Sequence, residues 1–318
     1  MDALTLPTPQ DVPAAHARIR DLIVETPVMT SEVMDAHLGA CLFFKCEQLQ
    51  KTGSFKFRGA SHAVSWLSDD CPGVATHSSG NHGAALALAA HLKGIGAEVV
   101  MPKNAIDAKI KAVGTHHGKV HFCEPTQQAR EAGLAHWVDQ GRVPIPPYDH
   151  PHIIAGQGTA ALELMAEVKD LDVIVAPIGG GGLISGTALA TLALNHPNKP
   201  RVIGIEPQGA DDTYRSLATG QRVTEHHPDT IADGLRALVG EMNFALIEAH
   251  VESVLCVTEQ DIVEAMVWLW RDLKQVIEPS GAVAFAGILA HPEVFKGQRV
   301  GVILSGGNMN LPNPLVAS

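Results

Sequence analysis

The chain has 318 residues, of which 46% are hydrophobic and 18% are charged, and its 23 basic against 34 acidic residues give a net charge of −11. This composition favours well-buried cores in two α/β lobes over a disordered chain. The acidic excess argues against binding of nucleic acid or of an anionic membrane surface, because both require a clustered basic surface.

The chain carries no sign of export. Residues 1–5 lack the basic and apolar segments of a secretory signal, and no apolar run is long enough to span a membrane. Five scattered cysteines form no CxxC pair, which is typical of reduced thiols in a cytoplasmic enzyme. The histidine pairs at 116–117 and 226–227 lack zinc-type spacing, so we expect them to face solvent.

The first half of the chain predicts alternating helices and strands. A helix over residues 14–24 ends before Pro27, because a residue that precedes proline avoids the α conformation. A strand over 40–46 and a helix that begins near Lys56 come next. Three β-α units then follow, with strands at 73–76, 97–101 and 119–123 and helices at 81–93, 107–113 and 126–139. Such units form a parallel sheet with helices on both faces.

A second series starts after the proline-rich turn at 144–147, which we interpret as the return to the other lobe. Its strands are predicted at 173–176, 202–205, 254–257 and 300–304, and its helices at 158–168, 183–194 and from the N-cap Thr258 to 274. The residues before the β-α units are expected to pack with this series. We therefore predict a discontinuous large domain, 1–68 and 150–318, and a small domain, 69–149.

Lys56 lies between two phenylalanines in the stretch Ser54-Phe55-Lys56-Phe57-Arg58-Gly59-Ala60. Apolar neighbours remove water from the ammonium group and lower its pKa, which leaves a free amine that can attack a carbonyl carbon. This is the chemistry of a Schiff-base lysine. The alternative is a lysine that lies along an amphipathic helix with its charged end in water.

Four consecutive glycines, Gly179, Gly180, Gly181 and Gly182, separate a predicted buried strand from a helix. Glycines let the backbone approach an anion closely, and a helix amino terminus offers N–H donors to a phosphate. The spacing matches neither GxGxxG nor GxxxxGK[ST]. A tight packing turn is the alternative.

Two more turns follow predicted strands. Residues 78–83, SSGNHG, offer hydroxyl, amide and N–H groups that suit a carboxylate, or they cap the next helix. Residues 305–308, SGGN, end the last strand, where ligands of open α/β sheets bind, or they form a plain glycine turn.

Together these stretches resemble the serine/threonine dehydratase and serine racemase family over nearly the whole chain, with the serine racemase and 3-hydroxyaspartate dehydratase branch as the nearest. The matching pieces are SFKFRGA (54–60), HSSGNHG (77–83), IAGQGT (154–159), GGGG (179–182), EPQGADD (206–212), TIADG (230–234), IEP (277–279) and SGGN (305–308). The resemblance implies an α/β fold with two open parallel-sheet domains, the tryptophan-synthase-β-like fold (fold type II) of pyridoxal-phosphate enzymes.

The resemblance also implies pyridoxal 5'-phosphate as the cofactor, bound covalently to Lys56. The phosphate would lie on the four glycines, with Asn81 at the ring oxygen and Ser305 at the pyridine nitrogen. A serine does not hold that nitrogen protonated, so the ring is a weaker electron sink and β-elimination is favoured over transamination. The implied cofactor-binding residues are Phe55, Lys56, Asn81, Gly179, Gly180, Gly181, Gly182, Gly234 and Ser305.

By the same resemblance, the enzyme would be an ammonia-lyase that turns a hydroxy amino acid into a keto acid and ammonia. Lys56 is the expected general base, and Ser78, Ser79 and Asn81 would bind the α-carboxylate. A serine or aspartate racemase, with Ser79 as a second base, is the alternative on this fold. A nucleotide-binding oxidoreductase is a remote alternative, because the chain lacks its GxGxxG signature.

The substrate prediction depends on Arg130, in the predicted helix 126–139. With His77, its guanidinium could bind a second substrate carboxylate, which favours 3-hydroxyaspartate over L-serine and L-threonine. A solvated helix arginine is the alternative. The chain departs from the racemase at Tyr148, where the racemase has an asparagine, and at Ala237, where it has a serine.

The racemase branch further implies a divalent cation, Mg²⁺ or Ca²⁺, bound by Glu206, Asp212 and the carbonyl of Ala210, since such ions prefer oxygen ligands. The alternative places these acids at a helix start, where the helix dipole favours them. We expect a cytoplasmic homodimer that binds a small amino acid as its substrate.

Overall fold

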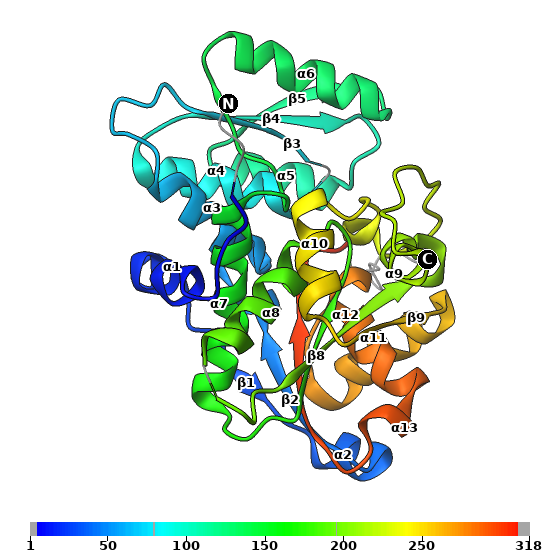
Figure 1. The fold of residues 1–318 in the computed structure, drawn as a ribbon. Coiled ribbons are helices and arrows are strands. Elements are labelled where there is room, and N and C mark those ends of the chain that lie inside the picture. Colours follow the sequence, from blue (N-terminus) through cyan, green and yellow to red (C-terminus); the bar gives the residue numbers. More distant parts are fainter. Residues whose placement is uncertain (1–4, 79, 195, 311–318) are drawn as a thin grey trace.

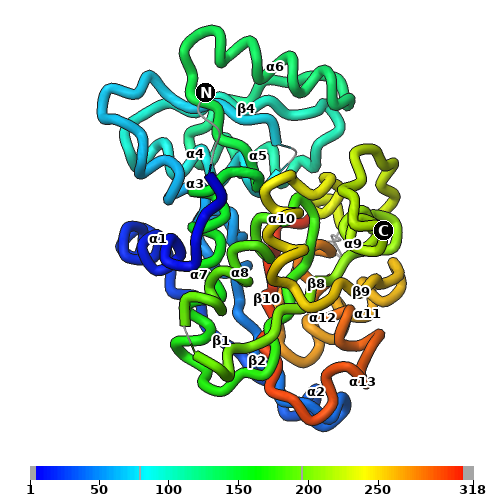
Figure 2. Tube along the Cα trace, in the orientation of Figure 1, coloured from blue at the N-terminus to red at the C-terminus, as the bar shows by residue number. Residues whose placement is uncertain are grey.

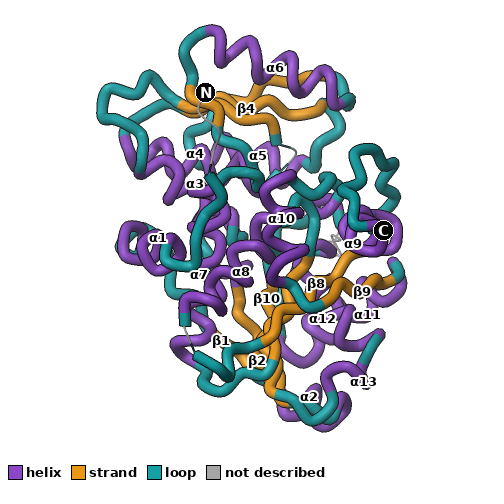
Figure 3. The backbone as a smooth tube through the Cα atoms, in the orientation of Figure 1, coloured by secondary structure: helices purple, strands orange, loops and turns teal. Residues whose placement is uncertain are grey.

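The computed structural model describes residues 5–78, 80–194 and 196–310. The chain forms two lobes, each built on a sheet with helices packed on its faces (Figure 1). Figure 3 shows the strands as two separate groups, one in each lobe. The predicted α/β fold with two parallel-sheet domains is therefore confirmed. The exact limits predicted for the domains stay a prediction.

The large lobe contains a six-stranded sheet in the order β1-β2-β10-β7-β8-β9. Only β1 runs antiparallel to its neighbour, and the other pairs are parallel. Strand β10, from the end of the chain, lies between β2 and β7, and Figure 2 shows this red strand close to the blue one. The strands are β1 (Val28–Met29), β2 (Cys41–Cys46), β7 (Val173–Pro177), β8 (Arg201–Pro207), β9 (Ser253–Val257) and β10 (Arg299–Leu304).

Successive side chains of a strand point to opposite faces of the sheet, so a strand that is apolar throughout supplies two cores. In β10, Val302 packs in the core that contains Phe285, whereas Ile303 packs in the core that contains Ile184. The helices of this lobe are α1 (Asp11–Ile19), α2 (Glu32–Leu38), α7 (Pro151–Glu167), α8 (Gly182–Ala193), α9 (Asp212–Thr219), α10 (Glu241–His250), α11 (Glu259–Leu273), α12 (Pro279–Ala290) and α13 (Pro292–Phe295).

The small lobe contains a four-stranded parallel sheet in the order β5-β4-β3-β6. Helix α3 (Lys56–Ser65) packs against α4 of this lobe and against α7 of the large one, so it joins the two. The other elements are β3 (Val74–His77), α4 (Asn81–Lys93), β4 (Ala97–Pro102), α5 (Asp107–Thr115), β5 (Lys119–Cys123), α6 (Gln127–Asp139) and β6 (Val143–Pro144).

Some predicted boundaries are wrong for physical reasons. The first helix ends at Ile19, not at residue 24, and α7 begins at Pro151, seven residues before the prediction. Helix α7 contains Gly156 and Gly158, which argue against a helix in a sequence. In the structure a Cβ at Gly156 would lie 2.8 Å from the Cα of Gly59, so the glycine is required where α3 and α7 cross. No helix among the described residues is long and apolar enough to cross a membrane.

Candidate active site

The predicted site residues gather where parallel strands end. Ser305 follows β10, the glycine run 179–182 follows β7, and the segment 78–83 follows β3. Lys56, Asn81 and Gly182 are the first residues of α3, α4 and α8. Ligands of open α/β sheets bind at the carboxyl ends of the strands, next to helix amino termini. The fold therefore brings these stretches, distant in sequence, to one end of each sheet.

The amine of Lys56 is crowded and has no acidic partner among the described residues. Its Nζ donates a hydrogen bond to the carbonyl oxygen of Pro147 at 2.8 Å and lies 5.0 Å from the centre of the Phe55 ring. Loss of hydration among these neighbours lowers the pKa of Lys56 to about 7, although part of the side chain is accessible. A large share of the amine is therefore uncharged near neutral pH, as a nucleophile or general base requires.

Two backbone segments, 52–55 and 305–308, hold the start of α3, and we call this pair the clasp. The N–H of Phe55 donates to the carbonyl of Ser305 at 3.1 Å, and the N–H of Gly307 donates to that of Gly53 at 3.0 Å. Gly53 has a left-handed backbone, with φ of 73°. Such a turn favours glycine. The clasp ties Phe55, the residue before Lys56, to Ser305.

The glycine run forms a tight turn between β7 and α8. Gly181 has a φ of 90°, and a Cβ at Gly180 would lie 2.2 Å from the ring of Tyr148. The carbonyl of Gly180 accepts hydrogen bonds from Asn243 Nδ2 at 2.8 Å and from the N–H of Gly240 at 3.1 Å. The close approaches explain why side chains do not fit here, and the two bonds keep the turn in place.

These residues fit a bound pyridoxal phosphate. Helix α8 begins with no side-chain cap and no acidic residue in its first turn, so its N–H groups are available to an anion. The buried Oε1 of Gln157 has no hydrogen-bond partner among the described residues and lies 2.5 Å from the position of a Cβ at Gly182. A phosphate on α8 and an aldehyde at Lys56 would each meet a suitable group.

Asn81 belongs to a polar network that the sequence did not reveal. Its Nδ2 donates to the buried Glu278, and its Oδ1 accepts from Asn308 Nδ2 at 3.0 Å. The buried Lys109, from the small lobe, pairs with Asp233 at 2.7 Å and with Glu278 at 3.1 Å. Glu278 and Asp233 stand in the matching pieces IEP and TIADG, but Lys109 gave no signal in the sequence.

Gly234 and Ser305 meet at a third residue, Ser280, near the start of α12. The N–H of Gly234 donates to Ser280 Oγ at 2.9 Å, and Ser305 Oγ lies 3.4 Å from the Ser280 carbonyl oxygen. Ser78 lies at the start of α4, where its Oγ accepts from the N–H groups of Gly80 and Gly83, each at 3.2 Å. Ser78 thus holds the turn before α4 through these two bonds, whereas the N-cap residue Gly80 makes no side-chain cap bond. Ser79 lies outside the described residues.

Electrostatic effects connect Lys56 to Arg130. Burial and then the charge of Lys56 lower the pKa of His82 to about 3, and His77 also contributes. Burial and the charge of Arg130 lower the pKa of His77 in turn. The buried Nε of Arg130 has no hydrogen-bond partner among the residues that the structure describes. Arg130 and His77 therefore lie within range of each other's charge, and the Arg130 Nε–H is left without a partner in the described chain.

The three residues predicted to hold a cation lie around the start of α9. Glu206, in β8, accepts from the N–H groups of Thr213 at 3.2 Å and Tyr214 at 2.9 Å, so it caps this helix. Burial and the nearby charge of Asp212 raise the pKa of Glu206 to about 8. Ala210 is buried in the turn before α9. Within the described ranges, no three His, Cys, Asp or Glu side chains converge as they would on a metal ion.

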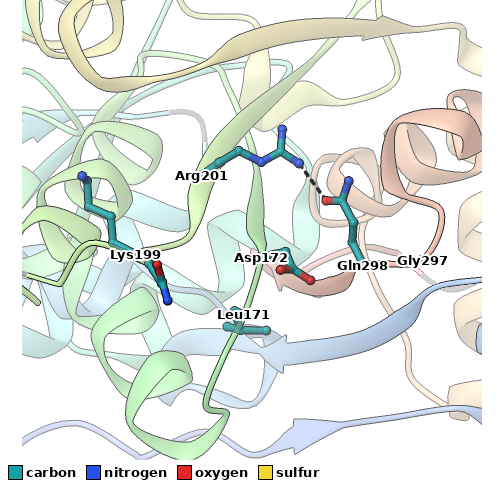
Figure 4. Close-up of a pocket in the computed structure, with 7 residues that line it drawn as sticks. Leu171, Asp172, Lys199, Arg201, Gly297 and Gln298 are labelled. Carbon is teal, nitrogen blue, oxygen red and sulfur yellow. Dashed lines mark hydrogen bonds between the residues drawn. The ribbon is translucent and has the colours of Figure 1, made fainter.

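A cavity of about 500 Å³ lies elsewhere, at the amino ends of β7, β8 and β10 (Figure 4). Asp172, Arg201 and Gln298 line it, and Arg201 donates to Gln298 Oε1 at 2.7 Å. None of the predicted site residues takes part in its lining. We therefore assign the chemistry to the opposite ends of these strands.

Residues 19–306 match the model of the pyridoxal-phosphate dependent enzyme family. The chain belongs to this family, and the cofactor implied by the sequence resemblance, pyridoxal phosphate, is confirmed.

Two curated proteins and one solved structure are similar to this chain over nearly its whole length. The chain is 46% identical to a "beta-hydroxyaspartate dehydratase" of Paracoccus denitrificans, over 96% of this chain and 98% of that one. It is 42% identical to an "L-threo-3-hydroxyaspartate ammonia-lyase" of Saccharomyces cerevisiae, over 97% and 95%. The solved structure of a serine racemase from Dictyostelium discoideum matches with a TM-score of 0.90 and 44% identity, over 96% and 99%.

Proposed function

We propose that this protein is an ammonia-lyase that removes water from a hydroxy amino acid and releases a keto acid and ammonia. Its substrate is 3-hydroxyaspartate in preference to L-serine or L-threonine. The observation that carries the proposal is the Lys56 amine, whose pKa is about 7 and which has no acidic partner in the described chain. Relatives that act on 3-hydroxyaspartate, by their names, support the substrate.

Lys56 acts as the general base. Bound pyridoxal phosphate supplies an electron sink for the electron pair left at Cα when the α-proton is removed. Lys56 Nζ takes that proton, and the Pro147 carbonyl orients the amine. The hydroxyl of Ser305 would hold the pyridine nitrogen without giving it a charge. The electron pair left at Cα would then expel the β-hydroxyl, which takes a proton from a nearby acid and leaves as water. Ser78, Ser79 and Asn81 bind the α-carboxylate.

Arg130 and His77 select the acidic substrate. The unpaired Nε of Arg130 and the effect of its charge on His77 support a position beside the site. A guanidinium binds a carboxylate through two parallel hydrogen bonds. The β-carboxylate of 3-hydroxyaspartate supplies such a group, whereas serine and threonine do not.

The test is direct. The purified holoenzyme should be yellow, borohydride should fix the cofactor to Lys56, and 3-hydroxyaspartate should yield oxaloacetate and ammonia faster than serine yields pyruvate. A colourless protein that binds a nicotinamide nucleotide would contradict the proposal, and so would a preference for threonine.

Serine or aspartate racemisation is the second candidate, favoured by the similarity to serine racemases. It requires a second proton donor on the face opposite Lys56, and Ser79 is the residue we assign to it. Ser79→Ala should abolish racemisation and spare much of the elimination, as chiral analysis of recovered substrate would measure. Equal loss of both activities would reject this division of roles.

A divalent cation, Mg²⁺ or Ca²⁺ by the sequence prediction, is bound by Glu206, Asp212 and the Ala210 carbonyl. The mutual effect of two fully buried carboxylates supports this, since a cation would remove their repulsion. A chelator should lower both the melting temperature and the rate, because an ion that binds only the folded state stabilises it. If neither changes, the cation site is wrong.

Assembly and compartment complete the proposal. The exposed face of α11 carries Val263, Val267 and Trp270 at helical spacing, which supports a homodimer through an apolar surface. Sedimentation at several concentrations should give twice the chain mass, and a monomer throughout would reject the dimer. The five cysteines, all free thiols, support the cytoplasm. The appearance of a tagged protein in an exported fraction would contradict it.

A further inference from the structure

Two buried side-chain atoms, one from the first residue of α9 and one from the loop that follows this helix, make no hydrogen bond within the described chain and lie close together. Asp212 Oδ1 lies 3.5 Å from Nδ1 of His226. Neither atom makes a hydrogen bond to any described residue. The Asp212 side chain is fully buried, that of His226 is 8% exposed, and the other oxygen of Asp212 accepts from the N–H of Val239 at 2.7 Å. Buried polar atoms normally have partners, so either a proton on His226 Nδ1 pairs it with Asp212 or a cation lies between the two atoms.

The other ring nitrogen of His226 fixes what Nδ1 offers. Nε2 lies 3.1 Å from the carbonyl oxygen of Arg236, and a carbonyl only accepts, so Nε2 carries the proton. In a neutral ring, Nδ1 then presents a lone pair toward the lone pairs of Asp212. Histidines that bind metal ions generally donate their second N–H to a carbonyl or carboxylate in this way, which holds the ring in position.

The spacing suits two ligands of one ion. Metal–nitrogen and metal–oxygen bonds to His and Asp are about 2.1 Å long, so donors 3.5 Å apart would meet at the ion with an angle of about 110°. Glu206 adds a second buried carboxylate beside Asp212, and its oxygens are turned to the first N–H groups of α9. Asp212 and His226 thus lie at the spacing of two ligands, and Glu206 would join them as a third only by rotating away from the N–H groups of α9.

We propose that His226 is a nitrogen ligand of the cation site and makes that site selective for ions that bind imidazole, such as Mn²⁺, Co²⁺ and Zn²⁺, over Ca²⁺. The inference rests on the cation site proposed above. It also corrects the expectation that His226 faces solvent. Imidazole binds late first-row ions well, whereas Ca²⁺ takes oxygen ligands almost alone, so one nitrogen donor shifts the preference.

The test measures metal binding and does not rely on catalysis. Holoenzyme is stripped with chelator, freed of unbound cofactor, and titrated with Co²⁺, Mn²⁺ and Ca²⁺ by calorimetry. We expect Co²⁺ to bind more tightly than Ca²⁺. His226→Gln should weaken Co²⁺ and Mn²⁺ at least about tenfold, since even partners of metal ligands are worth 10–100-fold. Its effect on Ca²⁺ should be much smaller. His227→Gln, at the exposed neighbouring residue, is the matched control and should change nothing.

The outcomes distinguish the cation site itself from the role of His226 as one of its ligands. If His226→Gln binds Co²⁺ as the wild type does, His226 is no ligand, although the cation site stands. If the wild type binds Ca²⁺ as tightly as Co²⁺, the selectivity is wrong. If it binds no ion, both the site and this inference fail, and Asp212→Asn would then leave the titrations unchanged. Ammonia release from 3-hydroxyaspartate, measured on the same preparation, tests the reaction independently.

Discussion

Two lysines near α3 are surrounded in opposite ways. Lys45 is fully buried, and its Nζ lies 2.8 Å from Glu163 and donates to the Thr26 carbonyl at 2.6 Å. Lys56 has only the Pro147 carbonyl as partner within the described chain, and its pKa falls to about 7. A paired lysine keeps its charge, whereas an unpaired, poorly hydrated one gives it up. This difference fits a structural role for Lys45 and the proposed catalytic role for Lys56.

The surroundings of Lys45 form a complete network. Arg58 is fully buried and binds Glu47 through Nε at 2.7 Å and Glu163 through Nη1 and Nη2, both at 2.7 Å. Burial alone would raise the pKa of Glu163, but bonds from His16 and Arg58 outweigh it and lower the pKa. Two cations thus balance two carboxylates directly behind the start of α3. Among the described residues no such balance exists at Lys56, whose Nζ bonds only to the carbonyl of Pro147.

The largest effect is expected from removing Lys56, the unpaired lysine of the two. Lys56→Ala should lower turnover by more than the roughly 10²–10⁴-fold typical of general-base catalysis alone, because covalent attachment of the cofactor is lost as well. Steady-state assays with 3-hydroxyaspartate would measure the loss. The exposed Lys111→Ala is the control and should keep full activity. Turnover of Lys56→Ala within tenfold of wild type would place the key amine elsewhere.

Removing the centre of the structural network should cost stability first. Arg58→Met leaves two buried carboxylates without their shared partner, and breaking a buried pair from one side typically costs about 3–5 kcal/mol. Denaturant unfolding would measure the free energy of unfolding. A change below about 1 kcal/mol would mean that the network contributes little. Arg271→Met, at an exposed arginine of α11, is the matched control and should change the stability little.

A third variant tests whether Arg130 binds the second carboxylate of the substrate. Arg130→Ala should lower kcat/KM for 3-hydroxyaspartate by tens-fold or more, since losing one partner of a buried charge pair costs roughly 2–5 kcal/mol. The same variant should change kcat/KM for serine much less, because serine has no second carboxylate. Serine is therefore the internal control. Equal losses on the two substrates would reject a pocket for dicarboxylates.

The smallest expected effect is the change in stability with pH as Lys56 loses its proton. A lysine whose pKa is lowered on folding binds a proton more weakly than the unfolded chain does, so it costs stability at low pH. For Lys56 this cost should disappear as the pH rises from about 7 toward the ordinary lysine value of 10.5. Melting of cofactor-free protein should show that gain, and Lys56→Met should lack it while Lys111→Met keeps it. Identical pH profiles for all three proteins would contradict the lowered pKa.

The sequence predicted what is local and missed what depends on distant partners. The strands from Lys119 to Cys123 and the helix from Asn81 to Lys93 matched because their periodicity and flanking residues are contained in the segment. Helix α12 was missed, since a helix that is buried all round shows no amphipathic pattern. The family motifs predicted pyridoxal phosphate at Lys56. They could not reveal the Arg58–Glu163 pair, whose members are 105 residues apart.

The clasp has a consequence for the order in which a ribosome could build this enzyme. The small lobe's sheet uses one uninterrupted stretch, from β3 to β6, so it can assemble while synthesis continues. The large sheet lacks its middle strand until β10 emerges, because β10 separates β2 from β7. The residues that hold Phe55 next to the lysine come later still. Domains generally fold as units during translation. Lys56 is thus held in place only after residues 305–308 have left the ribosome.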